Sequence, residues 1–203
     1  MALEPEYTDC MVDIETTGTQ PDRNAIIQIA AVKFNLKKRT VCPVFFNKSL
    51  TMPKHRHWDQ DTAVWWSKKK SVLHDIQSRA EPHAKIIREF ADFSYQTPSM
   101  KFWSKPSHFD FMFISSYLSD QELPNPFHYA EAMDVRSFWR GLYYPEQPPE
   151  PELAAQIPFS GPAHNALYDT LHQLKLLFAM VDRAEKSTRI QGEIKEAEIV
   201  HST

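Results

Sequence analysis

Apolar residues along the chain fall into runs whose spacing predicts a mixture of strands and helices. The predicted strands are Thr8 to Ile14, Ile26 to Phe34, Val41 to Asn47 and Met100 to Trp103. The predicted helices are Asp61 to Ser67, Pro82 to Phe93, Phe109 to Leu118, Val135 to Leu142 and Ala163 to about Lys186. Three antiparallel strands that come first, followed by alternating helix and strand, indicate an α/β fold with a mixed sheet flanked by helices.

Two carboxylates stand two residues apart at the end of the first predicted strand. Residues with this spacing share one face of a strand, so Asp13 and Glu15 are expected to point to the same side. Two like charges at this separation favour a bound cation, and Mg²⁺ and Mn²⁺ prefer carboxylate oxygens. Taken alone, the pair is explained equally well by an exposed strand edge that carries two acids.

A turn-rich segment, Thr16 to Asp22, follows these acids and leads into the second strand. This order predicts a β-hairpin, in which Gly18 is expected to supply a positive φ. Thr16 and Gly18, directly after Glu15, are candidate substrate-binding residues.

Two more acids stand at the start of predicted helices. The segment His108-Phe109-Asp110 opens an apolar run, with Asp110 in the first helical turn. His164 precedes Asp169 by five residues, which on a helix corresponds to roughly 140° beyond one full turn. Both side chains can therefore face one site only if His164 lies at or just before the helix start, which Gly161-Pro162 favours.

These segments together resemble the three motifs of the DnaQ-like 3'-5' exonucleases, the DEDD group of the ribonuclease H-like fold, in its DEDDh form. The resemblance is carried by Asp13-Ile14-Glu15-Thr16-Thr17-Gly18, Phe109-Asp110 and Ala163-His164-Asn165-Ala166-Leu167-Tyr168-Asp169, and it spans about Tyr7 to Val181. Trp103 and the Trp65-Trp66 pair make the motif style similar to that of phage exonuclease A and exonuclease VIII. The segment 105–108, Lys-Pro-Ser-His, departs from the His-Asn-Ala that many members carry.

The resemblance implies a site with two divalent ions, Mg²⁺ or Mn²⁺. It assigns as metal ligands Asp13, Glu15, Asp110 and Asp169. His164 completes the candidate catalytic set as the general base, because the imidazole pKa of about 6.5 lies near working pH. Trp65 and Trp66 are candidates for stacking on bases. Adjacent helix residues diverge by roughly 100°, so we expect one tryptophan at the site and the other in the core.

Other polar segments carry weaker signals. The run Lys68-Lys69-Lys70 fits a contact with a phosphate backbone, although a solvated helix end is the commoner role. Asp134 is expected to cap the helix that begins at Val135. Two cysteines, Cys10 and Cys42, are expected to be free thiols in a reducing compartment.

Length and composition fit one enzyme domain. The chain has 203 residues, of which 42% are hydrophobic and 24% charged, and we predict an exonuclease domain over 1–185 and a charged tail over 186–203. No secretory signal or membrane span is evident, which predicts a cytoplasmic protein with no membrane partner. The net charge of −3 provides no general attraction to nucleic acid, so binding would depend on local basic groups and metals.

The expected function is metal-dependent removal of nucleoside 5'-monophosphates from single-stranded 3' ends. DNA is the first expectation, by resemblance to the phage and exonuclease VIII types. Two alternatives stay open: an RNA-trimming exoribonuclease resembling RNase T, and a catalytically silent nucleic-acid-binding module. A ribonuclease H-type endonuclease is disfavoured, since His164 five residues before Asp169 is the exonuclease pattern. The sequence leaves the oligomeric state open, a homodimer included.

Overall fold

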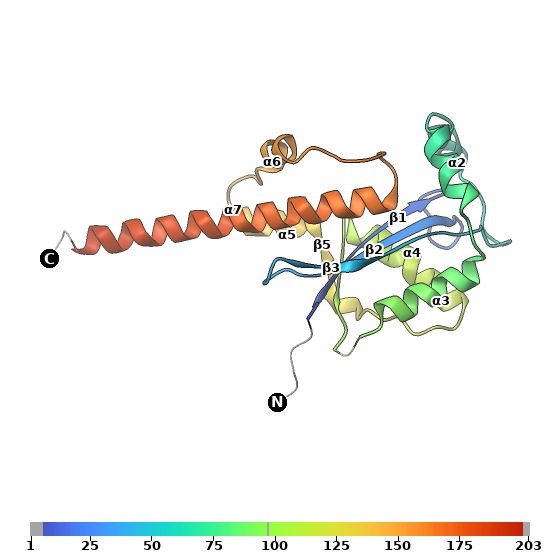
Figure 1. Cartoon of the computed structure of the whole chain (residues 1–203), viewed down its shortest axis with the longest axis horizontal. Coiled ribbons are helices and arrows are strands. Elements are labelled where there is room, and N and C mark those ends of the chain that lie inside the picture. Colours follow the sequence, from blue (N-terminus) through green and yellow to red (C-terminus); the bar gives the residue numbers. More distant parts are fainter. Residues whose placement is uncertain (1–5, 97, 201–203) are drawn as a thin grey trace.

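A five-stranded mixed sheet forms the centre of the molecule (Figure 1). The computed structural model describes residues 6–96 and 98–200. The strands are β1 (Asp9–Thr16), β2 (Ile26–Asn35), β3 (Thr40–Ser49), β4 (Lys101–Ser104) and β5 (Ala132–Asp134), and their order is β3-β2-β1-β4-β5. The first three pair antiparallel, as predicted, while β1 pairs parallel with β4 and β4 with β5. The expected α/β class with a mixed sheet is confirmed.

The helices cover both faces of this sheet. They are α1 (Gln60–Ser67), α2 (Lys70–Ser78), α3 (His83–Ser94), α4 (Ser107–Asp120), α5 (Val135–Tyr143), α6 (Glu150–Gln156) and α7 (Ala166–Val200), with a short 3-10 turn over Tyr129–Glu131. The elements α2, α6 and β5 were not predicted. A lysine run begins α2, prolines surround α6 and β5 has only three residues, so none of them has a strong periodic pattern.

The alternation of side chains along β1 divides the core in two. Cys10, Val12 and Ile14 pack on the face covered by α3 and α4. Met11 packs on the other face, against α5 and α7. Because successive strand residues point to opposite faces, Asp13 and Glu15 lie on the α7 side of the sheet. The two catalytic candidates on β1 are therefore directed toward the helix that carries Asp169.

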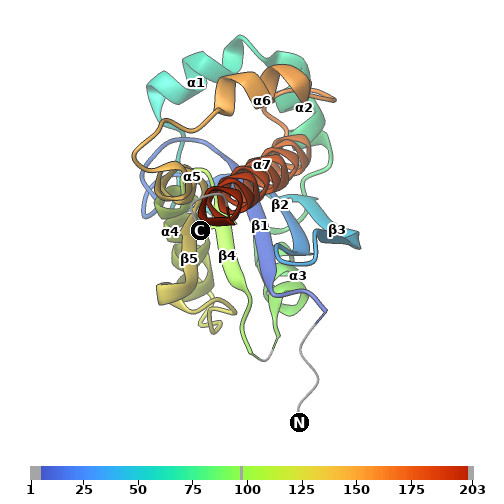
Figure 2. The ribbon, with the colours of Figure 1, turned by 90° about the vertical axis from the view of Figure 1, so that its left-hand side faces the viewer.

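A buried glutamine on β2 fixes the start of α7. Gln28 accepts a hydrogen bond from the backbone N–H of Ala166 (3.0 Å) and donates one to Asn47 on β3 (3.0 Å). The first N–H groups of a helix lack partners within the helix, so this contact sets where the helix begins. Figure 2 shows α7 lying across one face of β1 and β2.

The helix α7 continues past the predicted domain boundary. It runs without a break from Ala166 to Val200, whereas residues 201–203 of the predicted tail lie outside the described residues. The division at 185 therefore stays a prediction. No helix in the described part of the chain is long and apolar enough to cross a membrane. Cys10 and Cys42 are both free thiols.

The cap predicted at Asp134 is confirmed. Its Oδ1 accepts a hydrogen bond from the N–H of Ser137 in the first turn of α5 (2.7 Å). Its Oδ2 accepts a second one from the N–H of Ser107 at the start of α4 (3.1 Å). One carboxylate thus joins the starts of the two helices that follow β4 and β5.

Candidate active site

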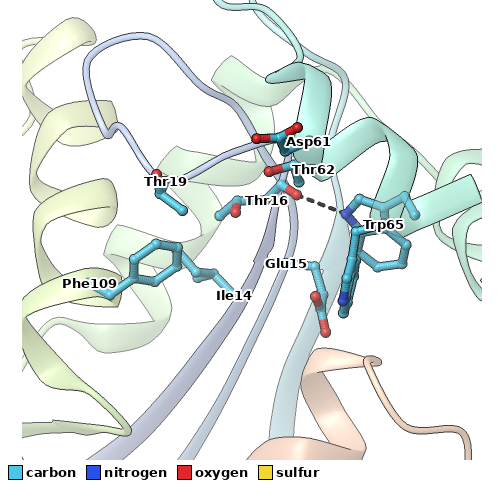
Figure 3. Close-up of a pocket in the computed structure, with 9 residues that line it drawn as sticks. Ile14, Glu15, Thr16, Thr19, Asp61, Thr62, Trp65 and Phe109 are labelled. Atoms are coloured by element: carbon cyan, nitrogen blue, oxygen red, sulfur yellow. Dashed lines mark hydrogen bonds between the residues drawn. The ribbon is translucent and has the colours of Figure 1, made fainter.

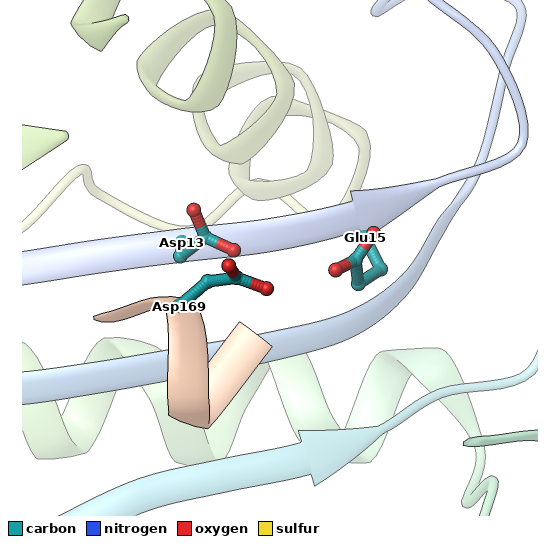
Figure 4. A group of neighbouring side chains, drawn as sticks. All are labelled: Asp13, Glu15 and Asp169. Atoms are coloured by element: carbon teal, nitrogen blue, oxygen red, sulfur yellow. The ribbon is translucent and has the colours of Figure 1, made fainter. Parts of the chain in front are cut away.

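Three carboxylates meet where β1 ends and α7 begins (Figure 4). Asp13 and Glu15 come from β1, and Asp169 comes from the first turn of α7. Each offers an oxygen that lies within 4.8 Å of those of the other two. All three are among the candidate catalytic residues predicted from the sequence.

Asp110 reaches the same region from the other side of β1. It lies in the first turn of α4, is buried, and accepts a hydrogen bond from the backbone N–H of Ile14 (3.0 Å). Burial raises the pKa of Asp110 to about 7. It stands outside the group of three, but its charge raises the pKa of Asp13 and of Glu15. The four predicted acids therefore form one electrostatic cluster.

Burial and the charges of neighbouring acids raise the pKa of the two carboxyls on β1. Burial raises the pKa of Asp13 well above its usual range, and the charges of Asp110, Glu15 and Asp169 raise it further. For the same reasons the pKa of Glu15 rises to about 8. One oxygen of Asp169 is buried without a hydrogen-bond partner in the described structure. An all-oxygen set with an unpartnered carboxylate oxygen fits Mg²⁺ or Mn²⁺.

A glutamine that the sequence analysis missed holds one of these acids. Gln173 donates a hydrogen bond from Nε2 to Oδ1 of Asp13 (2.9 Å), which lowers the pKa of that carboxyl. It lies four residues after Asp169 on α7 and so on the same helix face. Its four-residue spacing from Asp169 could have identified Gln173 as a site residue from the sequence.

His164 stands directly before α7, as its spacing from Asp169 predicted. Its φ of 62° belongs to the left-handed region and turns the chain into the helix that starts at Ala166. Its ring meets the ring of Trp65 edge to face, with centroids 4.7 Å apart. Burial lowers the pKa of His164, and the nearby Lys69 lowers it further. The imidazole is therefore neutral near pH 7 and able to accept a proton.

Lys69 belongs to this neighbourhood and is not a plain solvated helix end. Its Nζ lies 3.7 Å from the centre of the Trp65 ring, and its charge lowers the pKa of both Glu15 and His164. A cation beside the acids agrees with the phosphate contact considered for the lysine run, which stays a prediction.

An aromatic cavity of about 470 Å³ lies beside Glu15 (Figure 3). It is lined by Ile14, Glu15, Thr16, Thr19, Asp61, Thr62, Trp65, Trp66 and Phe109. Trp65 is 38% exposed, whereas Trp66 is 1% exposed and donates its indole N–H to the carbonyl of Thr16 (3.0 Å). The tryptophan pair therefore differs in exposure: Trp66 packs in the core, Trp65 is accessible from the cavity, and its stacking on a base stays a prediction.

Gly18 has another role than the one predicted. The expected positive φ is wrong, since Gly161 is the glycine with a positive φ among the described residues. A Cβ at Gly18 would lie 2.3 Å from Cγ of the buried Asn24, so the position needs glycine because of close approach. Gly18 lines neither this cavity nor the neighbouring one.

A second cavity, of about 450 Å³, shares Ile14 and Glu15 with the first and contains the three carboxylates of Asp13, Glu15 and Asp169. Its lining consists of Asp13, Ile14, Glu15, Lys105, Arg136, Phe159, His164, Asp169, His172 and Gln173. The catalytic cleft therefore has an aromatic lobe and a charged lobe that meet at Glu15. Lys105 and Arg136, which add positive charge to this lobe, come from different segments and were not predicted.

The mixed sheet, the acidic cluster and the neighbouring histidine agree with the resemblance to DnaQ-like exonucleases of the DEDD class. The chain belongs to the family described as the 3'-5' exoribonuclease Rv2179c-like domain, whose model matches residues 8–181. It is a 3'-5' exonuclease by family.

Solved structures share this fold at low sequence identity. The nuclease domain of 3'hExo, a DEDDh family member bound to rAMP, has a TM-score of 0.63 at 15% identity, covering 89% of this chain and 95% of that one. S. pombe Pop2p, in its Mg²⁺- and Mn²⁺-bound form, has a TM-score of 0.65 at 15% identity, covering 87% and 84%. The E. coli ExoI-ssDNA complex has a TM-score of 0.61 at 15% identity, with 87% of this chain but 40% of that chain covered. The comparison with curated protein sequences gave no match.

Proposed function

We propose that the protein is a two-metal 3'-5' exonuclease that shortens single-stranded RNA and releases nucleoside 5'-monophosphates. The observation that carries this proposal is the meeting of Asp13, Glu15 and Asp169 within 4.8 Å, between an aromatic cavity and His164. The aromatic lobe fits a terminal nucleoside and the acidic lobe fits the phosphodiester that joins it to the strand.

The carboxylates account for metal binding. Asp13, Glu15 and Asp169 would hold one ion, and Asp13 with Asp110 would hold the second. When bound, the metals lower the pKa of a water and stabilise the attacking and leaving oxygens of the displacement. Gln173 orients Asp13 for this role through its hydrogen bond to Oδ1.

His164 would take the proton of the attacking water. Burial and the charge of Lys69 lower the pKa of His164 and so keep its imidazole neutral, which is the form that accepts a proton. Trp65 contacts this imidazole and also lines the aromatic cavity, where it would stack on the terminal base. Stacking of a base on an aromatic ring contributes about 1–3 kcal/mol without sequence preference, which suits an enzyme that must accept any terminal nucleotide.

The choice of RNA rests on the description of the family, a 3'-5' exoribonuclease domain. The sequence alone favoured DNA through the motif style, and DNA is the competing substrate in the test. The cytoplasmic location stays a prediction from the sequence.

A product ladder tests the proposal directly. RNA and DNA single strands of one sequence, and their duplexes, carry a 5' label and are incubated with Mg²⁺ or Mn²⁺. We expect stepwise shortening from the 3' end of single-stranded RNA, and none with Asp110→Asn or in excess chelator. Faster shortening of DNA would reassign the sugar, and internal cuts would indicate an endonuclease. Strand binding without cleavage would make the chain a silent binding module.

A further inference from the structure

A third cavity, of about 240 Å³, lies beside the catalytic cleft on α5. It is lined by Arg136, Trp139, Arg140, Gln147, Pro148, Glu150 and Pro151. Arg136 also lines the charged lobe of the catalytic cleft, so the two spaces adjoin at that side chain. The third cavity shares no lining residue with the aromatic lobe. The three spaces therefore follow one another, with the acids in the middle.

The arginines of this cavity have no direct partner for their guanidinium groups. Arg136 and Arg140 are both exposed and stand four residues apart on α5, a rise of about 6 Å. Among the described residues neither guanidinium makes a hydrogen bond or an ion pair, although the charge of Arg136 lowers the pKa of the nearby Asp134. Glu150, the acid in the lining, is paired with Lys105. Two free guanidinium groups thus face a cavity whose carboxylate is already engaged.

The buried wall of this cavity also contains a hydrogen-bond donor that has no acceptor. Trp139 is 1% exposed, and its indole N–H has no hydrogen-bond partner in the described part of the chain. Buried donors without an acceptor are uncommon in folded proteins. Gln147 adds a side-chain amide to the same lining. This surplus of donors fits an anion rich in oxygens, and the guanidinium fork matches phosphate geometry.

We propose that this cavity binds a backbone phosphate of the nucleic-acid strand, upstream of the bond being cut. The inference rests on the proposed function, because it takes the strand direction from it. With the terminal base in the aromatic lobe and the scissile phosphate at the acids, the preceding phosphates pass over Arg136 to Arg140. The site would give this acidic chain a local hold on the strand and make longer substrates bind more tightly.

Arg140→Gln tests the site, because Arg140 lines the third cavity and not the catalytic cleft. The matched control is Arg88→Gln, which removes an equal charge from an exposed position on α3, on the other side of the sheet. Steady-state kinetics compare a dinucleotide with a longer single strand over a range of salt concentrations. We expect Arg140→Gln to raise KM for the longer strand about five- to tenfold at unchanged kcat. The slope of log KM against log salt should fall by about 0.7.

Each other outcome has a distinct meaning. Unchanged KM on the longer strand, or an equal rise on both substrates, would overturn the proposal. A rise in Tm with inorganic phosphate that depends on Arg140, combined with unchanged strand kinetics, would assign the cavity to a free anion instead. If the wild-type protein cuts neither substrate, the proposed function fails. The fluorescence anisotropy of a labelled strand, measured on wild type and Arg140→Gln, then still decides whether the cavity binds the strand.

Discussion

Replacing Glu15 by Gln should stabilise the metal-free protein at neutral to alkaline pH, although it removes a metal ligand. Burial and the charges of Asp169 and Asp110 raise the pKa of Glu15 from 4.5 to about 8. Because this pKa is higher in the folded than in the unfolded state, the folded protein binds more protons between these values. The free energy of unfolding therefore falls as the pH rises from about 4.5 to about 8. Gln resembles the protonated acid and avoids this loss.

The size of the effect follows from the shift. One pKa unit corresponds to about 1.4 kcal/mol, so the full shift of Glu15 sets an upper bound of about 5 kcal/mol. The neighbouring acids share the repulsion and take up protons in turn, so we expect about 2–4 kcal/mol at pH 8. At 2–4 °C per kcal/mol, this raises Tm by roughly 5–15 °C. At about pH 5 both proteins carry a neutral group, and the difference should nearly vanish.

Thermal unfolding followed by circular dichroism measures the difference in Tm between wild type and Glu15→Gln. It is recorded in EDTA at about pH 5 and about pH 8, and again with Mg²⁺. The control is Glu146→Gln, which changes an exposed acid and should leave Tm unaltered at both values. With Mg²⁺ the order should reverse, since the wild type gains binding energy that the variant has lost. The reasoning is refuted if Glu15→Gln lowers Tm in EDTA at pH 8, or if its gain is the same at both pH values.

Three further substitutions test the proposed general base, the tryptophan proposed to stack on nucleobases, and the glycine packed against Asn24. His164→Ala should lower kcat by about 10²–10⁴-fold and flatten the acidic limb of the rate profile, with metal affinity by calorimetry near wild type. Trp65→Ala should raise KM for oligonucleotides about tenfold through lost stacking, measured by initial rates. Gly18→Ala should cost about 1–3 kcal/mol in urea unfolding, because its Cβ displaces Asn24 from its hydrogen bonds to Gln20 and His57.

Matched variants control these experiments. His74→Ala, which changes an exposed histidine, is the control for His164→Ala and should leave turnover unaltered. Unchanged turnover in His164→Ala would exclude His164 as the general base. Trp65→Phe keeps a ring and should retain most of the affinity, so an unaltered KM in Trp65→Ala would exclude stacking. Gly141→Ala places a Cβ in open space within α5 and should be neutral or slightly stabilising. A Gly18→Ala protein as stable as Gly141→Ala would contradict the close-approach argument.

Local patterns were sufficient for the parts of this protein that depend on neighbours in the chain. The two-residue period of a strand directs Asp13 and Glu15 to one face, and the geometry of a helix start brings His164 and Asp169 to one site. The hairpin of β1 and β2 follows from two apolar runs around a polar turn. These features are short-range, so the sequence alone determined them.

Tertiary structure decided what depends on approach between distant segments. The rings of Trp65 and His164 meet although the two residues belong to distant segments, and Arg136 lines the cavity of the acids because β5 joins the sheet beside β4. Arg136 carries no local pattern that marks it as part of a site. Gly18 illustrates the same limit: a turn suggested a backbone conformation, whereas the packing of Asn24 supplied the actual constraint. Propensity and periodicity describe one segment at a time, while such contacts arise only when the whole sheet has assembled.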